Sequence, residues 1–526
     1  MNKKWTALLF ALVLACAVLA GCQGNQTAQP AAPAAAPEAA TAAAPADNGE
    51  PFAVVDNDKD FSALRTPGSQ ESAYEYRTFF LPAIDGIHQP YVGDTMPYYE
   101  DGTYYIYYLK EGGDSYNHSI YLATTKDFVT YTEYDDPIVE SSRSGGQDGW
   151  VGTGSVVKVK DTYYFFYTGH ASSDTYEYIE KVMVAQGSSP DRFEKVEEWA
   201  ITPPADLGQK RDFRDPQAYY DEETGTIVMT VTASQGGIAR ILKYTLSADL
   251  KNVHYDGIIF TNTQGNFWNL ECSDTFRIGD RYYITYSAQD DTLWYAMSDT
   301  PYGPYGEAKR LDGDLFYAAK HVESPDGSYM VGWARRSESP SSTTDVSGWA
   351  GNLAVQQLKQ KENGELALAP VEAVEVQYNK RRPLRIDKDA IEIQAGSRYS
   401  YTDVFTAYET FMLKGKFTYT GSGSFGLAFD YNEQSDKTKI IALNPTEQKL
   451  RLLFNEGDTL ITETAVSLEA GREYSFTYIQ EGSVGIFWLD NDASLTVRLY
   501  GASGKAIRLF AENNTISFSS MREYTR

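Results

Sequence analysis

The sequence predicts an all-β protein, a five-bladed β-propeller followed by a C-terminal β-sandwich, and three observations support this prediction. From about residue 75 onward, aromatic and β-branched residues alternate with polar ones between turns of Gly, Asp and Pro, a pattern typical of strands. One turn-and-strand motif recurs five times at similar spacing. The chain has 526 residues, more than the roughly 250–300 at which one hydrophobic core stops growing, so several folded units are expected.

The first 22 residues have the pattern of a bacterial lipoprotein signal. Lys3 and Lys4 precede an apolar stretch at residues 5–20, shorter than the ~20 residues that span a bilayer. The stretch ends in Leu-Ala-Gly before Cys22, which resembles a lipobox. We expect residues 1–21 to be a lipoprotein signal peptide and Cys22 to carry the lipid; the alternative is a plain signal peptide with a chance cysteine. The prediction is an exported protein at the bacterial cell surface, membrane-anchored only through its lipid.

Residues 22–70 are predicted to form the lipidated start and a linker. Residues 23 to about 50 are mostly Ala, Pro, Gln and Thr without apolar periodicity, and a flexible chain of this length reaches roughly 30 Å. Cys272 is the one cysteine that follows this segment, so no disulfide is expected within the folded part.

Residues 75–370 are predicted to form the propeller. The motif is a turn of Asp or Gly followed by a short aromatic and β-branched strand, and it occupies residues 102–108, 161–167, 225–230, 280–286 and 327–333. Successive copies lie 59, 64, 55 and 47 residues apart, counted from the third residue of each. In an all-β chain this period indicates propeller blades of four strands. An irregular β-sandwich with recurrent hairpins is the alternative.

Residues 380–526 are predicted to form a β-sandwich. The strand pattern resumes there without the repeat, for example at residues 423–429 and 449–454. Alternation and turn spacing fit two packed sheets, and we expect this domain to pack against the propeller.

A set of polar residues shares one position in the repeat. Ten to twelve residues before the copies lie Asp94, Thr153, Asp215, Glu271 and Tyr317. Equivalent positions of innermost strands converge on a propeller axis, so three carboxyl groups are expected at one mouth of the channel, where repulsion and burial raise the pKa of at least one. Taken singly, Asp94 fits a turn aspartate and Asp215 fits a structural ion pair; the shared position favours a functional site.

The composition of the chain and the motifs that it lacks exclude several classes of function. The chain carries 46 basic and 72 acidic side chains, a net charge of −26, which disfavours nucleic-acid partners. Its 40 tyrosines suit both strands and stacking on sugar rings.

The usual zinc-protease, serine-hydrolase and Walker motifs do not occur, so catalysis by carboxyl groups remains. The commonest reaction of carboxyl groups on sugars is glycoside cleavage, here of an oligo- or polysaccharide. We expect no cofactor and no metal, and the sequence gives no oligomeric state.

Several short motifs follow one another along the predicted propeller: Thr153-Gly154-Ser155, Tyr167-Thr168-Gly169, Arg214-Asp215-Pro216, Glu271-Cys272, Phe316-Tyr317-Ala318-Ala319 and Gly332-Trp333. In this order they resemble the motifs of glycoside hydrolase family 32, the invertases, levanases and inulinases. The resemblance implies a five-bladed propeller with a β-sandwich that releases fructose from fructans or sucrose.

The resemblance also implies roles for individual residues. Asp94 is the expected nucleophile, and Glu271 is the expected general acid and later base. Asp215 is expected to stabilise the transition state, with Arg214 keeping it ionised and binding a fructosyl hydroxyl. The residues expected to shape the pocket for the terminal sugar are Thr153, Tyr317 and Trp333. The outcome implied is retention, with the carboxyl groups of nucleophile and acid about 5–5.5 Å apart.

The opening motif departs from the family. It has Gly93-Asp94-Thr95-Met96-Pro97 where the family has Asn-Asp-Pro-Asn, and Leu109 stands where many members have glutamine. The linkage and the identity of the sugar therefore stay open. The alternatives are an inverting propeller glycosidase active on arabinan or xylan, a fructosyltransferase, and a non-catalytic sugar-binding surface lipoprotein.

Overall fold

The computed structural model describes residues 69–71, 77–83, 89–112, 118–143, 145–338, 346–384, 389–429, 438–454, 459–490, 492–502 and 505–526. The predicted signal peptide (1–21), Cys22 and all but the last two residues of the predicted linker (22–70) lie outside these ranges. No helix within them is long and apolar enough to cross a membrane.

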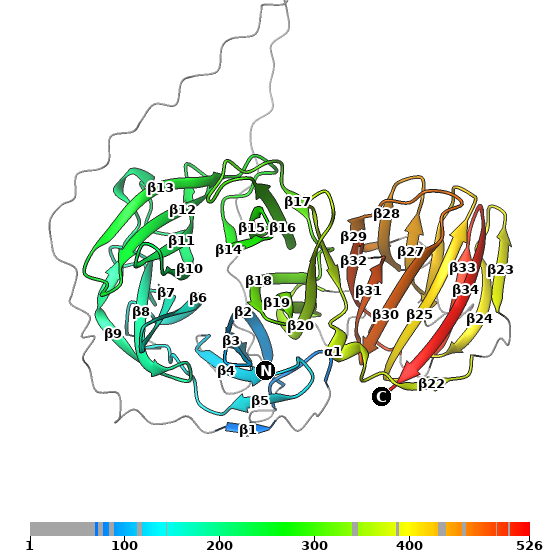
Figure 1. Ribbon diagram of the computed structural model, residues 1–526, viewed down its shortest axis with the longest axis horizontal. Helices are drawn as coiled ribbons and strands as arrows, with labels where there is room; N and C mark the ends of the chain where they lie inside the picture. Colours follow the sequence, from blue (N-terminus) through cyan, green and yellow to red (C-terminus); the bar gives the residue numbers. More distant parts are fainter. Residues whose placement is uncertain are drawn as a thin grey trace, which may run out of the picture. The chain divides into compact units, whose positions relative to one another are not determined.

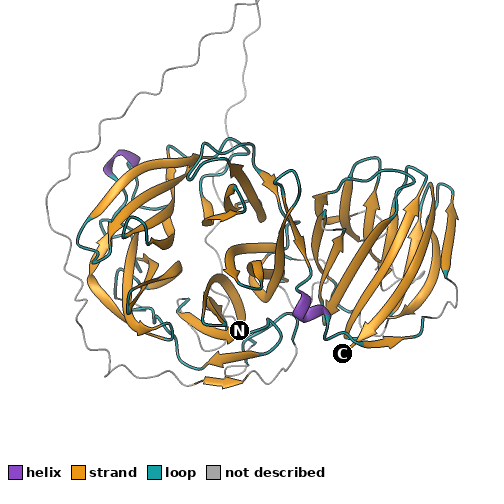
Figure 2. Ribbon diagram, viewed as in Figure 1, coloured by secondary structure: helices purple, strands orange, loops and turns teal. Residues whose placement is uncertain are grey.

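Strands dominate the described chain (Figure 2), and the first twenty-one build five blades arranged in a ring (Figure 1). Each blade is a meander of antiparallel strands, and its first strand lies innermost. Blade 1 holds β2 (Tyr91–Glu100), β3 (Thr103–Glu111), β4 (Ile120–Thr125) and β5 (Tyr131–Tyr134), with β1 (Ser69–Glu71) at its edge. Blade 2 holds β6 (Trp150–Val159), β7 (Thr162–His170), β8 (Glu180–Ser189) and β9 (Arg192–Ile201).

The other three blades repeat this order. Blade 3 holds β10 (Phe213–Asp221), β11 (Thr226–Gln235), β12 (Ile238–Ser247) and β13 (Val253–Thr261), after a 3-10 turn at Ala205–Leu207. Blade 4 holds β14 (Leu270–Ile278), β15 (Arg281–Ala288), β16 (Thr292–Ser298) and β17 (Lys309–Arg310). Blade 5 holds β18 (Phe316–Ser324), β19 (Gly327–Arg336), β20 (Gly348–Gln360) and β21 (Leu366–Ala369). Val92 of β2 pairs with Gly351 of β20, which joins the last blade to the first.

The aromatic strands of the repeat become the second strand of each blade, and their large side chains fill the spaces between blades. Tyr104, Tyr164 and Tyr283 are almost fully buried in this way. Rings of this size bury enough apolar surface to hold neighbouring sheets together, at roughly 25 cal/mol per Å². The recurring tyrosines therefore explain both the repeat and the ring.

A short helix, α1 (Glu372–Glu375), leads into the predicted sandwich. One sheet has the order β22-β34-β25-β30-β31-β32, with β23 also on β34, and the other has the order β24-β33-β26-β27-β28-β29. The bounds are β22 (Lys380–Arg382), β23 (Ala390–Ala395), β24 (Ser400–Thr406), β25 (Thr410–Tyr419), β26 (Phe425–Phe429), β27 (Lys439–Asn444), β28 (Lys449–Phe454), β29 (Thr459–Ala465), β30 (Tyr474–Glu481), β31 (Val484–Leu489), β32 (Ala493–Arg498), β33 (Ala506–Ala511) and β34 (Asn514–Thr525). The predicted fold class is confirmed.

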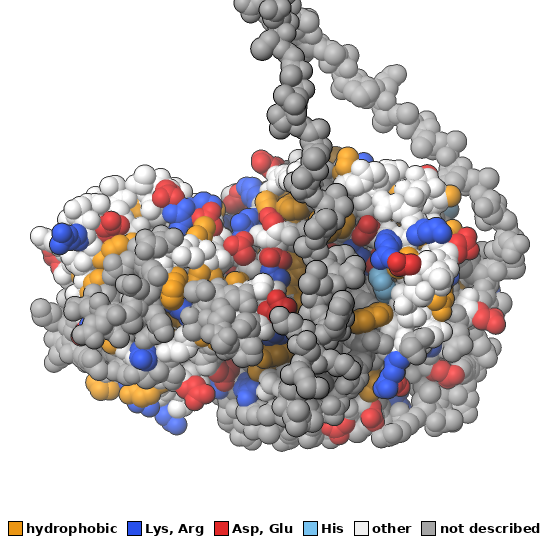
Figure 3. Space-filling model, turned by 180° about the vertical axis from the view of Figure 1, so that it is seen from behind, with side chains coloured by type: hydrophobic (Ala, Val, Ile, Leu, Met, Phe, Trp, Pro, Cys, Tyr) orange, Lys and Arg blue, Asp and Glu red, His pale blue; other side chains and the backbone are white. Residues whose placement is uncertain are grey.

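A buried aspartate fastens β32 to the propeller. Asp312, fully buried between blades 4 and 5, accepts hydrogen bonds from Ser494 Oγ (2.9 Å) and from the backbone N–H of Thr496 (2.9 Å). Trp488 of β31 donates its ring N–H to Gln356 of β20 at 2.8 Å. Buried polar groups paired in this way fix one arrangement of the two domains, because each would be costly to leave unpaired. Elsewhere on the surface, acidic and basic side chains are mixed (Figure 3).

Candidate active site

A cavity of about 340 Å³ opens at one mouth of the propeller. Its floor holds the three carboxyl groups of the shared repeat position, Asp94 of β2, Asp215 of β10 and Glu271 of β14. The remaining lining residues among those described are Leu109, His118, Trp150, Val151, Gly152, Thr153, Thr168, His170, Glu180, Arg214 and Trp349. The structure thus brings together three carboxyl groups that lie up to 177 residues apart, from Asp94 to Glu271.

Each innermost strand is interrupted where it reaches the site. The pairing register shifts between Val92 and Thr95, Gly152 and Gly154, Arg214 and Gln217, Glu271 and Asp274, and Tyr317 and Lys320. A β-bulge inserts an extra residue and re-aims the side chains beside it. Asp215 (φ 57°), Cys272 (φ 51°) and Ala318 (φ 49°) have left-handed backbones at three of these points. The bulges turn the carboxyl groups toward the cavity at the end of each innermost strand.

Asp94 is held by two donors from other blades. Thr153 donates its hydroxyl to Oδ2 of Asp94 at 2.8 Å, and Trp333 donates its ring N–H to Oδ1 at 3.2 Å. Each carboxylate oxygen therefore has a partner, and the two hydrogen bonds fix the orientation of the group.

Glu271 is held by Tyr317, whose hydroxyl donates to Oε2 at 2.7 Å, and by Arg214, whose Nη2 lies 3.6 Å from Oε1. Burial in the channel mouth raises the pKa of Glu271, while Arg214 and Tyr317 act in the opposite direction; Asp94 adds to the increase. A carboxyl group with a raised pKa keeps a proton at higher pH, which suits a general acid.

Asp215 is the most deeply buried of the three, with 3 % of its surface exposed. It accepts a hydrogen bond from the backbone N–H of Cys272 at 2.7 Å, and its own N–H donates to Thr168 at 2.9 Å. Burial raises the pKa of Asp215 to about 7; Arg214 opposes this, while Glu271 and Asp94 add to it. The attraction of Arg214 favours the ionised form of Asp215, as expected, but burial has the larger effect on its pKa.

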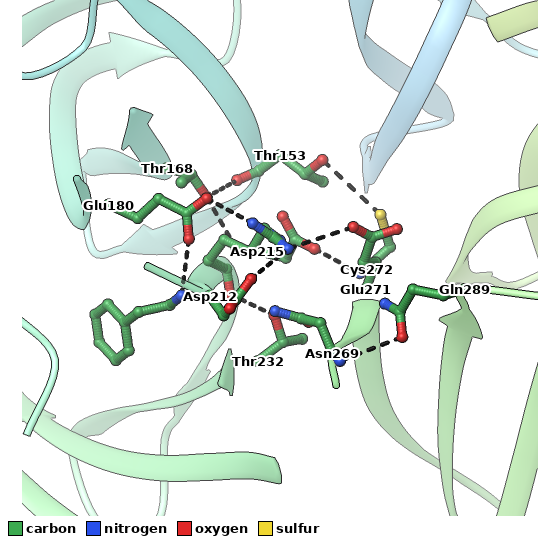
Figure 4. A network of polar contacts seen from close by, with 12 residues as sticks. Thr153, Thr168, Glu180, Asp212, Asp215, Thr232, Asn269, Glu271, Cys272 and Gln289 are labelled. Atoms are coloured by element: carbon green, nitrogen blue, oxygen red, sulfur yellow. Dashed lines mark hydrogen bonds and ion pairs between the residues drawn. The ribbon is translucent and has the colours of Figure 1, made fainter. Parts of the chain in front are cut away.

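A charged network surrounds Arg214, and Figure 4 labels the carboxyl groups that take part in it, Glu180, Asp212 and Glu271. Nη1 of Arg214 donates to Glu180 at 2.5 Å and its Nη2 donates to Asp212 at 3.1 Å. Glu180, on β8, also accepts the backbone N–H of Phe213 at 2.8 Å and lies 3.2 Å from Nδ1 of His170. Burial works against ionisation of Glu180, but Arg214 and these hydrogen bonds outweigh it and lower the pKa of Glu180 to about 2. Arg214 is thereby fixed between a permanent anion and the reacting carboxyl groups.

Two residues expected to shape the pocket, Tyr317 and Trp333, are not among the residues that line the cavity. Trp333 is fully buried and Tyr317 is 6 % exposed, and both stand behind the carboxyl groups that they contact. They orient Asp94 and Glu271 rather than lining the cavity. Thr153 does line it, and Arg214 reaches it from the side.

Aromatic rings that the sequence analysis missed form one wall of the cavity. His118 stacks on Trp349 with centroids 4.6 Å apart and meets Trp150 edge-on at 5.3 Å. Trp150 is 44 % exposed. Flat rings with one open face are the usual partners of the apolar faces of sugars. These residues do not share one position in the repeat: Trp150 begins β6, His118 lies in the connection between β3 and β4, and Trp349 lies in the third strand of blade 5.

The departure at Gly93 has a structural counterpart. A Cβ atom at position 93 would lie 2.2 Å from the ring of Trp349 and 2.9 Å from the carbonyl oxygen of Leu109. Any side chain at this position would therefore displace Trp349. The glycine that replaces the family's asparagine therefore leaves the space that Trp349 occupies in the cavity wall. Leu109 lines the same cavity.

The arrangement supplies an oriented carboxylate, a carboxyl group with a raised pKa, and a third buried carboxyl group beside a fixed guanidinium. These are the groups that glycoside cleavage requires. Among the described residues, no cluster of three or more His, Cys, Asp or Glu side chains is arranged to hold a metal ion.

Comparison with known proteins gives a consistent result. Residues 94–370 match the N-terminal domain of glycosyl hydrolases family 32. A sucrose-6-phosphate hydrolase of Staphylococcus xylosus is 23 % identical over 407 residues, which cover 72 % of this chain and 78 % of that protein.

Two solved structures share the fold. A sucrose-6-phosphate hydrolase from Lactobacillus gasseri has a TM-score of 0.65 at 18 % identity, over 86 % of this chain and 93 % of that one. An exo-inulinase from Aspergillus awamori has a TM-score of 0.66 at 16 % identity, over 86 % and 98 %. The family match begins at Asp94.

Proposed function

This chain belongs to glycosyl hydrolase family 32, and we propose that it releases fructose from sucrose or fructans with retention of configuration, with Asp94 as nucleophile and Glu271 as general acid and base. The observation that carries the assignment of roles is the convergence of Asp94, Asp215 and Glu271 in one cavity, each with its own hydrogen-bond partner. The family match makes the chain a glycoside hydrolase that acts on fructosides.

In the first step, Asp94 attacks the anomeric carbon of the fructosyl unit. Glu271 gives its proton to the departing glycosidic oxygen, so the bond breaks without releasing an alkoxide. The donors from Thr153 and Trp333 hold the carboxyl group of Asp94 in one orientation. The carboxylate form of Asp215 stabilises the positive charge that develops on the sugar ring, and Arg214 donates hydrogen bonds to a fructosyl hydroxyl.

In the second step, Glu271 is a carboxylate and takes a proton from water. The resulting hydroxide equivalent attacks the anomeric carbon from the side the leaving group left, and the bond to Asp94 breaks. Two displacements at one carbon restore the original configuration. Fructose leaves, Glu271 is protonated again, and Asp94 returns as the carboxylate.

The charge of the cavity supports an uncharged fructoside. Its charged lining residues in the described part of the chain are four carboxylic acids, one arginine and two histidines. Arg214 is paired with Glu180 and Asp212, and His118 lies 3.0 Å from a carboxylate oxygen of Glu111. A phosphate on the substrate would meet these carboxylates in a site of low dielectric, where repulsion is strong. The name of the Staphylococcus xylosus relative describes a phosphorylated substrate; this site favours its unphosphorylated counterpart.

The N-terminal sequence supports a location outside the cytoplasm. Cys22 at the lipobox-like motif and the Ala- and Pro-rich linker fit a lipid-anchored enzyme with its catalytic domain held off the membrane. Labelling of cells with a palmitate analogue should mark the parent chain and not Cys22→Ala.

Incubation of the chain with sucrose, inulin and levan tests the activity. We expect fructose from at least one of them, and we expect Glu271→Gln to lose about a thousandfold or more of kcat while still binding the sugar. Glu307→Gln, an exposed carboxyl group on blade 4, is the matched control and should keep full activity. Fructose transferred to sugar instead of water would indicate a transferase, and no turnover would indicate a sugar-binding protein.

A further inference from the structure

A second and larger cavity, of about 650 Å³, opens at the opposite mouth of the propeller. The same innermost strands that carry the catalytic carboxyl groups reach it at their other ends: β2 contributes Tyr98, β10 contributes Tyr219, and β14 contributes Phe276. At about 3.3 Å per strand residue, these side chains lie roughly 13–17 Å along the strands from Asp94, Asp215 and Glu271.

The channel between the two cavities is filled. Lys320 of β18, 1 % exposed, donates from Nζ to the carbonyl oxygen of Gly154 at 2.8 Å and to Oε1 of Gln217 at 2.9 Å. Lys320 and the groups that it contacts separate the second cavity, which Gln217 lines, from the catalytic one, so a molecule bound there would not obstruct the reaction.

Tyrosine rings dominate the second cavity. They come from blades 1, 3 and 4 and are Tyr98, Tyr99, Tyr219, Tyr220, Tyr282, Tyr283, Tyr302 and Tyr305. Tyr219 is 38 % exposed, which is unusual for so large a ring. Burial raises the pKa of Tyr302 to about 12, so its phenol remains neutral and can both donate and accept hydrogen bonds. Rings with open faces and neutral hydroxyls match molecules that alternate C–H faces with hydroxyl groups.

The charges of the second cavity fit a neutral ligand better than an anionic one. Lys158 lies 2.5 Å from Glu100, and Arg277 lies 3.5 Å from Asp280, so both lining cations have acidic neighbours. Glu222 and Glu323 are exposed carboxyl groups on the same lining and are ready acceptors for sugar hydroxyls.

We propose that this tyrosine-lined cavity is a second carbohydrate-binding site, which holds a segment of a neutral polysaccharide while the other mouth of the propeller cleaves chain ends. That the polysaccharide is a fructan rests on the proposed function. A cavity of 650 Å³ falls within the range of small-molecule sites and is almost twice the volume of the catalytic one. A short substrate such as sucrose needs only the catalytic cavity, whereas a polymer can occupy both.

Affinity electrophoresis of the full chain in gels that contain inulin tests this site. Glu271→Gln serves as the background, because it blocks hydrolysis during the run. Adding Tyr219→Ala or Tyr282→Ala should weaken inulin retention by about fivefold, a loss typical of one stacking contact. Tyr408→Ala, an equally exposed tyrosine of the sandwich (41 %), is the control and should not change retention. In the active chain, Tyr219→Ala should keep kcat/KM for sucrose within about twofold and raise KM for inulin.

If both tyrosine variants are retained by inulin as strongly as Glu271→Gln alone, the proposal of a second site is overturned. A change in oligomeric state with Tyr219→Ala at unaltered retention would also overturn it, because the cavity would then be a contact between copies of the chain. The proposed function fails separately: if no fructoside is cleaved but retention depends on Tyr219, the binding site stands and the hydrolase assignment does not.

Discussion

The hydroxyl of Tyr317 on blade 5 donates a hydrogen bond of 2.7 Å to Glu271 on blade 4, so the general acid of one blade is oriented by its neighbour. Tyr317 also lowers the pKa of Glu271, against the larger opposing effect of burial. The orientation and the pKa of the Glu271 carboxyl group thus both depend on a residue of the neighbouring blade, which the closed ring holds in contact with it.

Removing this hydroxyl in Tyr317→Phe should raise the pKa of Glu271 further. Activity requires protonated Glu271 and is lost as pH rises through its pKa, so the basic limb of kcat/KM should move to higher pH, with a tenfold or smaller loss at the optimum (about 1.4 kcal/mol). A pH–rate profile for sucrose measures this. Tyr286→Phe, a buried tyrosine of the same blade as Glu271, should leave the profile in place. An unmoved basic limb in Tyr317→Phe would show that the hydrogen bond does not control Glu271.

Glu180→Gln should move the basic limb the other way. Glu180 raises the pKa of Glu271 through its negative charge, and its loss also frees Arg214 to act on Glu271. The basic limb should therefore shift to lower pH, and KM should rise about tenfold because Arg214 is less firmly held. The same pH profile measures both. We expect the basic limb to move to lower pH in Glu180→Gln and to higher pH in Tyr317→Phe. Movement in the same direction in both variants would contradict the electrostatic account.

Asp215→Asn should stabilise the protein in a pH-dependent way. The pKa of Asp215 is about 7 in the folded protein and 3.8 without the fold, so the folded state binds the extra proton between these values. Stability is therefore lost as pH rises from about 4 to 7, and the loss is complete above 7. Asparagine carries no such cost, and the gain should be on the order of 2 kcal/mol at pH 8 and much smaller near pH 4.5. Urea unfolding of both proteins at the two pH values checks this; an equal gain at both would contradict the raised pKa.

Sucrose should be a better substrate than sucrose-6-phosphate. The catalytic carboxyl groups and Glu180 repel a phosphate, and we expect kcat/KM to favour sucrose by about tenfold or more at low salt, with less discrimination at 1 M salt because repulsion is screened. Initial rates at both salt concentrations measure the ratio. Preference for the phosphorylated sugar would require a cation in the cavity beyond those described.

The sequence predicted the ring and the convergence of Asp94, Asp215 and Glu271 because both depend on a period that is visible in one chain. It did not predict Glu180 as a partner of Arg214, since the two are 34 residues apart on different blades and nothing in the repeat aligns them. The positions of Tyr317 and Trp333 behind the carboxyl groups depend on bulges that a strand pattern does not show. Trp349 is visible only through its contact with Gly93, which is a property of packing.

The most direct test of the central claim is fructose release from sucrose and inulin by the parent chain and by Asp94→Asn. Asp101→Asn, an exposed aspartate in the turn of the same hairpin, is the control. We expect the parent and the control to release fructose at equal rates and Asp94→Asn to lose about a thousandfold or more of kcat, because the amide cannot act as nucleophile. Fructose release by Asp94→Asn within tenfold of the parent would contradict the account.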